Sequence, residues 1–248
     1  MVRKRTAKTV ALAAFGVLWA SSSFAEGTDC FSYGYEDPGR SVNGLIALGR
    51  VNNQSPRVNF LKTSILKAGC PNKSAACQDK PYLVSGDEVV IIGTKGDFVC
   101  ASYAGKQGRV TDGWLPRSAI SIVQDQPDVG AKDWIGRWQS GPEQSIVIEQ
   151  VDKAGVLAIK GDATWGASDP ERVKRGAINI GSLEGETKVE GAILSFGIGE
   201  NGTLPFDQAD EEDCKVQMQR LGPYLLVKDN NNCGGMNVSF TSVYRRTK

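Results

Sequence analysis

The residue types in this chain limit the chemistry that it can perform. None of its 248 residues is a histidine, which excludes the Ser-His-Asp triad, the Cys-His dyad and every metal site that needs an imidazole ligand. Catalysis would therefore rest on carboxylates, Lys, Tyr, Ser or Cys. We expect neither a cofactor nor a bound metal.

The six cysteines are predicted to form three disulfide bonds. An even number of cysteines in an exported chain is typical of a disulfide framework. The two cysteines of the C-terminal half stand alone there, and a loop of six residues separates the pair at 70 and 77, so the remaining two are left for each other. The predicted bonds are Cys30–Cys100, Cys70–Cys77 and Cys214–Cys233.

Carboxylates offer two further kinds of site. An acidic cluster precedes Cys214, but it lacks the alternating pattern and the glycine of a calcium loop, so we favour a solvated charged loop. Asp162 and Glu171 are the type of pair that a glycosidase uses, although the sequence shows neither a cleft nor a set separation between them. The residues of the cluster are Asp207, Asp210, Glu211, Glu212 and Asp213.

Aromatic side chains are the candidate ligand-binding groups. Trp114, with Tyr82 or Tyr103 beside it, would form a platform for an extended peptide. The alternative is that Trp114 packs in the core of its domain. Trp165 lies in a long loop at 162–172 that is rich in functional groups, and such loops often bind ligands. Here the alternative is a surface connection with Trp165 packed onto the domain.

The first 25 residues have the three parts of an export signal. Four cations precede an apolar run from Val10 to Trp19, and Ser23-Phe24-Ala25 is a small-x-small cleavage site. We therefore predict a signal peptide over 1–25 and a periplasmic or secreted protein. The apolar run is about half the length that a bilayer requires, so we expect no membrane insertion.

Removal of this segment leaves 25 basic and 28 acidic residues. Binding to a phosphate backbone needs a clear cationic surplus, so we expect no nucleic-acid partner. The mature length fits two domains, separated by a polar stretch that contains proline and glycine. The predicted parts are an extension over 26–54, a first domain over 55–123, a linker over 124–132 and a second domain over 133–248.

The first domain is predicted to be a small β-barrel, because short apolar segments alternate with glycine-containing reversals. Residues 83–89 read Leu-Val-Ser-Gly-Asp-Glu-Val, an aromatic strand at 98–103 ends in tyrosine, and residues 113–115 read Gly-Trp-Leu. Together with an opening strand at 57–62, these motifs resemble the bacterial SH3-like (SH3b) domain family over residues 55–122.

That resemblance implies a domain that recognises short peptides or the peptide stems of peptidoglycan and rarely catalyses a reaction. The first loop departs from the family pattern, because it is longer and contains Cys70 and Cys77. In the family, this loop borders the ligand groove.

The second domain is predicted to be an antiparallel β-barrel or β-sandwich. Segments at 145–149 and 156–159 flank a turn and indicate a hairpin, and further apolar segments give about eight strands in all. Gly136-Arg137-Trp138 and Tyr244-Arg245-Arg246 resemble the lipocalin arrangement, in which a Gly-x-Trp on the first strand packs on a late arginine. The expected fold class is thus all-β, an SH3-like barrel followed by this second β-domain.

Two classes of function fit these observations. The first is a non-enzymatic cell-envelope binding protein whose SH3-like module docks on peptide or peptidoglycan and whose β-domain binds a second partner, such as an envelope protein, with inhibition of a wall hydrolase as one role. The alternative is a carboxylate-dependent hydrolase that acts in the envelope. The absence of histidine and the pairing of every cysteine favour the first class.

Overall fold

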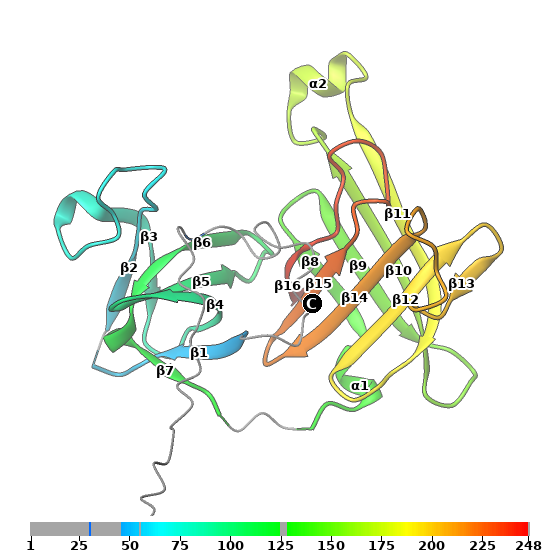
Figure 1. The fold of residues 1–248 in the computed structure, drawn as a ribbon, viewed down its shortest axis with the longest axis horizontal. Coiled ribbons are helices and arrows are strands. Elements are labelled where there is room, and N and C mark those ends of the chain that lie inside the picture. The colour runs from blue at the N-terminus through cyan, green and yellow to red at the C-terminus, as the bar shows by residue number, and fades with distance from the viewer. Residues whose placement is uncertain (1–29, 31–45, 55, 125–127, 248) are drawn as a thin grey trace, which may run out of the picture.

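The computed structural model describes residues 30, 46–54, 56–124 and 128–247. The predicted signal peptide lies outside the described residues, as do most of the predicted extension and part of the predicted linker. Two antiparallel sheets contain almost all of the regular structure, which confirms the all-β fold class (Figure 1). No helix in the described part of the chain is long and apolar enough to span a bilayer.

Seven strands form the first sheet, which curves into a half-barrel (Figure 1). They are β1 (Ala47–Val51), β2 (Arg57–Leu61), β3 (Gln78–Val84), β4 (Glu88–Lys95), β5 (Phe98–Ala104), β6 (Val110–Pro116) and β7 (Ile120–Ile122). Their order across the sheet is β3-β2-β6-β5-β4-β1-β7. The sheet begins at Ala47, inside the segment predicted to be an extension, because β1 pairs with both β4 and β7.

Both faces of the half-barrel are covered along the strand β5. Alternate residues of a strand point to opposite faces of its sheet. On β5, Val99 and Ala101 belong to the core of the half-barrel itself. Cys100 and Ala104 point the other way and are equally buried, Cys100 beside Trp114 and Ala104 against residues of the second sheet.

Nine strands form the second sheet, which is a nearly closed barrel. They are β8 (Gly136–Ser140), β9 (Gln144–Gln150), β10 (Val156–Trp165), β11 (Asn179–Lys188), β12 (Ile193–Gly199), β13 (Gly202–Leu204), β14 (Cys214–Leu221), β15 (Tyr224–Asp229) and β16 (Ser242–Thr247). Their order is β11-β10-β9-β8-β16-β15-β14-β12-β13. The Glu186 amide donates to Thr203 Oγ1 at 3.0 Å and Thr187 Oγ1 donates to the Ser195 carbonyl at 3.3 Å, which brings β11 against β12 and β13. Of the two predicted architectures, the second domain is therefore the barrel.

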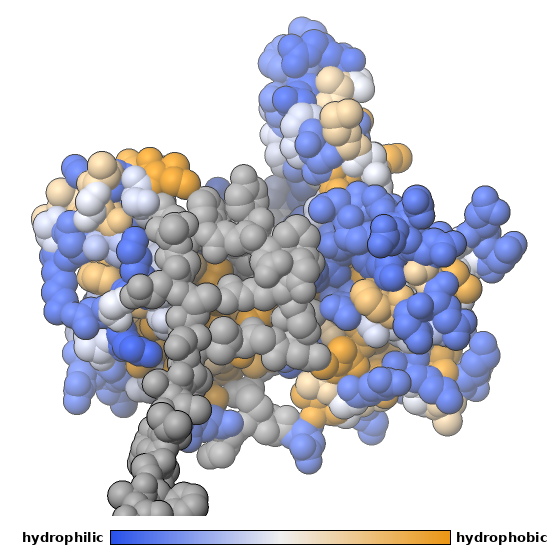
Figure 2. Space-filling view, in the orientation of Figure 1, coloured by the Kyte–Doolittle hydropathy of each residue, from blue (hydrophilic) through white to orange (hydrophobic). Residues whose placement is uncertain are grey.

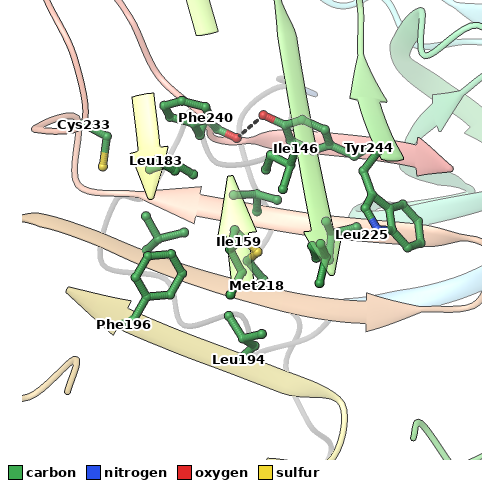
Figure 3. Packing of buried hydrophobic residues seen from close by; sticks show 14 of the residues in the cluster. Ile146, Ile159, Leu183, Leu194, Phe196, Met218, Leu225, Cys233, Phe240 and Tyr244 are labelled. Carbon is green, nitrogen blue, oxygen red and sulfur yellow. Dashed lines mark hydrogen bonds between the residues drawn. The ribbon is translucent and has the colours of Figure 1, made fainter. Parts of the chain in front are cut away.

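The barrel is filled by its own side chains (Figure 3). Phe196 and Phe240 are completely buried, and Tyr244 donates a hydrogen bond of 2.9 Å from its hydroxyl to the Phe240 carbonyl. Gly185 makes room for this packing, since a Cβ there would lie 2.7 Å from the Phe196 ring. The residues that line the inside of the barrel thus form a packed core.

In the described residues, four short helices connect the strands: η1 (Ala75–Cys77), η2 (Arg117–Ala119), α1 (Ala131–Trp134) and α2 (Pro170–Lys174). The Asp133 carboxylate accepts the Gly130 amide at 2.8 Å and thereby caps α1. Asp169 caps α2 by accepting the Glu171 amide at 2.9 Å. In both helices, a side-chain acceptor near the start satisfies an amide that has no partner within the helix.

The three predicted disulfide bonds are confirmed. Cys30 is bonded to Cys100 in a small buried cluster with Trp114, on the face of the first sheet opposite Val99 and Ala101. Cys70–Cys77 closes the loop between β2 and β3, and Cys214–Cys233 ties β14 to the loop that follows β15. Every cysteine in the chain is paired. These bonds indicate an oxidising, extracytoplasmic environment.

The Gly-x-Trp segment of β8 makes the contact with a late arginine that its resemblance implied. The Trp138 ring is buried, and the guanidinium groups of Arg220 and Arg246 lie 4.4 and 4.7 Å from its centroid. Trp138 Nε1 also donates to the Trp134 carbonyl of α1 at 2.8 Å. Burial, with repulsion from Arg246, lowers the pKa of Arg220 to about 10.

The two barrels share an apolar interface. Leu48 and Val90 of the first sheet pack with Leu221 and Leu226 of the second, and all four are buried. A Cβ at Gly222 would lie 2.6 Å from Leu48, so the turn between β14 and β15 fits closely against β1.

Hydrogen bonds join the barrels at the same interface. The Tyr224 hydroxyl donates to the Glu88 carbonyl, and Arg245 Nη1 donates to the Ala104 carbonyl at 3.0 Å. Desolvation of the Tyr224 phenol raises its pKa. The half-barrel and the barrel therefore form one continuous packed body.

Candidate functional site

The structure places Trp114 in the interior rather than on a binding surface. Its side chain is 1% exposed and packs with Leu61 and the Cys30–Cys100 bond. The ring projects from the face of the central strand β6, and Leu61 and the disulfide cover it on that face. The structure therefore has no peptide platform centred on Trp114. The Trp114 ring packs in the core, which was the alternative interpretation.

Tyr82 and Tyr103 do not lie together with Trp114. Trp114 pairs with Cys100, and Tyr103 is three residues further along β5, so Tyr103 points to the opposite face. Its hydroxyl lies 3.4 Å from Asp87 Oδ1, and burial is the main cause that raises its pKa. Tyr82 is half exposed on β3, with the Arg57 guanidinium 3.7 Å from its ring centroid. Tyr103 therefore faces away from Trp114, and Trp114 is buried whereas Tyr82 is exposed, so the three rings do not form one exposed aromatic surface.

Trp165 is the predicted ligand-binding residue that the structure places in a groove. This interdomain groove has a volume of about 430 Å³ and is lined by residues of both barrels. At its edge the Gly141 amide donates to the Gly108 carbonyl at 2.6 Å, which fixes one barrel to the other. The lining residues used below are Arg109, Asp112, Glu143, Gln144, Trp165 and Asn237.

The Trp165 side chain is held at the end of β10. Its ring packs against the barrel core, and the Arg172 guanidinium of α2 lies 4.0 Å from the ring centroid. Cation–π contacts of this kind hold both partners in place. Trp165 therefore combines the two roles weighed from the sequence, because it packs onto the barrel and also lines the groove.

The polar groups of the groove have fixed positions. Gln144 Nε2 donates to the Ser239 carbonyl at 2.6 Å, and the Ser168 amide donates to Glu143 Oε1 at 2.5 Å. Asp112 accepts a hydrogen bond from the Ser102 hydroxyl. Because these side chains are already ordered, a ligand loses little of its binding energy in arranging them.

A buried carboxylate supports one wall of the groove from behind. Asp229 is 4% exposed, and its Oδ1 accepts hydrogen bonds of 2.6 Å from both the Ser239 and the Thr241 hydroxyls. Ser239 and Thr241 themselves line the groove. Asp229 thereby orients the segment between β15 and β16 toward the space between the barrels.

The other carboxylates considered above lie elsewhere. Asp162 is exposed on β10 and Glu171 is exposed on α2, and neither lines the interdomain groove. In the acidic loop, Asp213 Oδ2 accepts the Asp210 amide at 3.0 Å. Within the described residues, no three acidic or cysteine side chains are arranged to hold a metal ion.

Several lining residues of the groove carry no signal in the sequence. Arg109 precedes β6, Gln144 begins β9 and Asn237 precedes β16, so the three are far apart along the chain. The fold of the second barrel brings Gln144 close to the segment that contains Asn237, and Arg109 joins them only because the first barrel packs on the second. Comparison with protein-family models, with curated proteins and with solved structures finds no match to this chain.

Proposed function

We propose that this chain is an exported, non-enzymatic cell-envelope binding protein that holds a peptidoglycan fragment in the interdomain groove. The observation that supports it is a groove with an aromatic ring and several fixed polar side chains contributed by two domains. Sugar rings stack on aromatic faces, and their hydroxyls need hydrogen-bond partners of the kind that Gln144 and Asn237 offer. The positive charge of Arg109 suits the carboxylates of a peptide stem.

The first barrel takes the part that its resemblance to bacterial SH3-like domains implies, recognition of peptide or peptidoglycan. Its contribution comes from the start of β6, at Arg109 and Asp112, rather than from Trp114. The second barrel supplies Trp165 and binds a second partner, an envelope protein such as a wall hydrolase that the complex inhibits. We propose a periplasmic or secreted location for the mature chain.

Calorimetric titration with a soluble disaccharide-tetrapeptide tests this proposal. We expect binding that weakens by about tenfold, or about 1.4 kcal/mol, in Asn237→Gly and in Arg109→Ala. Both side chains are exposed, and glycine adopts the φ of +65° found at Asn237, so neither change should alter the fold. The matched control is Arg175→Ala, an exposed arginine beyond the end of α2. Equal binding by all four proteins would refute the assignment of the groove.

A carboxylate-dependent hydrolase remains the alternative, because Asp112 and Glu143 line the same groove. Both carboxylates already accept hydrogen bonds, from Ser102 and from the Ser168 amide, which suits positioning more than proton transfer. Mass spectrometry of the same muropeptide after long incubation separates the two functions. Cleavage that Glu143→Gln abolishes would establish the hydrolase.

A further inference from the structure

The loop between β2 and β3, residues 62–77, contains two adjacent apolar side chains that are largely exposed. Ile65 and Leu66 are each 69% exposed. The loop projects from the first sheet at the upper left of Figure 1, and apolar surface gathers at its end in Figure 2. Isolated exposed aliphatic side chains are common, but two adjacent ones on a projecting loop form an apolar contact surface.

The loop is held in shape without help from a partner molecule. The Lys67 amide donates to the Thr63 carbonyl at 3.0 Å, and the Leu66 amide lies 3.4 Å from Thr63 Oγ1. The Cys70–Cys77 bond closes the rest of the loop. A surface that is already ordered loses little conformational entropy when it binds.

The charge of the loop has one sign. Residues 62–77 include three lysines and no acidic residue. Lys67 and Lys73 are exposed, and Lys62 is half-buried with its ammonium group donating to the Ala76 carbonyl at 3.1 Å. This local charge contrasts with the mature chain, in which acidic residues outnumber basic ones.

We propose that this loop is a peripheral docking site for an anionic phospholipid bilayer. Ile65 and Leu66 enter the boundary between head groups and acyl chains, where aliphatic side chains leave water, and the lysines remain among the anionic head groups. A projecting, convex tip fits the flat surface of a bilayer. The disulfide bonds indicate an extracytoplasmic compartment, and such a compartment is bounded by membrane. The interaction is reversible and independent of the interdomain groove.

Vesicle co-sedimentation of the disulfide-bonded mature protein tests this docking site. We expect binding to vesicles of phosphatidylglycerol with phosphatidylethanolamine, little binding to phosphatidylcholine, and weaker binding as salt is raised. Ile65→Ser with Leu66→Ser should lower the partition coefficient at least about tenfold. Lys67→Gln with Lys73→Gln should lower it by about tenfold as well.

The matched control is Ile180→Ser with Met236→Ser, because these two side chains are 68% and 78% exposed on the second barrel. This control should bind vesicles like the unmodified chain. An equal loss in the control, or no preference for anionic vesicles, would overturn the docking site. Loss with the lysine changes but not with the serine changes would show adsorption to the head groups without entry of Ile65 and Leu66, and would overturn the apolar part of the docking site. A loop variant that binds vesicles normally but loses muropeptide would assign it to a wall-binding surface.

Discussion

Truncation of Leu48 to alanine tests whether the two barrels unfold as one unit. Leu48 lies on β1 of the first sheet but is 3% exposed and packs with Leu221 and Tyr224 of the second. Removal of a buried leucine side chain costs about 2–5 kcal/mol. With a loss of about 3 kcal/mol and a urea m-value of roughly 3 kcal/mol/M, the unfolding midpoint falls by about 1 M.

Hydrogen exchange followed by mass spectrometry across a urea series measures the unfolding of each barrel separately. Peptides from β5 and from β14 should lose protection at one common midpoint, and Leu48→Ala should lower both. Leu83→Ala provides a matched variant, because Leu83 is 1% exposed and lies in the core of the half-barrel alone. If Leu83→Ala shifts only β5 and leaves β14 unchanged, the barrels unfold independently and the reasoning from the shared interface is refuted.

Four further expectations follow from particular contacts. Burial raises the pKa of Tyr224. The stability that the neutral phenol provides is therefore complete below pH about 10 and declines as the pH rises above that value. Tyr224→Phe should show a smaller alkaline fall in melting temperature than the unmodified chain. Replacing the Cys214–Cys233 bond with two serines opens a loop of 19 residues and should cost about 3 kcal/mol in chemical denaturation. Gly185→Ala should cost about 1–3 kcal/mol, because the new methyl group meets the Phe196 ring at 2.7 Å. Trp114→Leu should cost about 2–4 kcal/mol, and normal stability of that variant would contradict its burial.

The fold class and the disulfide pattern were predictable from the sequence because both depend on local signals. Alternating apolar residues and glycine-containing turns mark strands wherever they occur, and the strand at 98–103 is an example. The pairing of Cys30 with Cys100 followed from the shortness of the loop at 70–77 and from the isolation of the C-terminal pair. β1 was missed because its sequence, Ala-Leu-Gly-Arg-Val, is short and contains a glycine.

The candidate site was less predictable, because exposure depends on which strands become neighbours. Glycine precedes Trp114 and follows Trp165, yet Trp114 is buried on a central strand and Trp165 lines a groove. The order of strands around a sheet is not encoded by the residues next to either tryptophan. Arg109 and Asn237 have ordinary loop sequences, and only the docking of the two barrels makes them neighbours.

The interface between the barrels is therefore as important for the proposed function as the residues in the groove. Tyr224 and Arg245 of the second barrel both donate to carbonyl groups of the first, and Leu48 fills the space beside the turn at Gly222. These contacts fix the distance between Arg109 on one barrel and Trp165 on the other. A ligand that spans the groove would meet both side chains at once without first drawing the domains together, so its binding should need little domain movement. For that reason, a change at the interface far from the groove should weaken ligand binding even where every lining residue is intact.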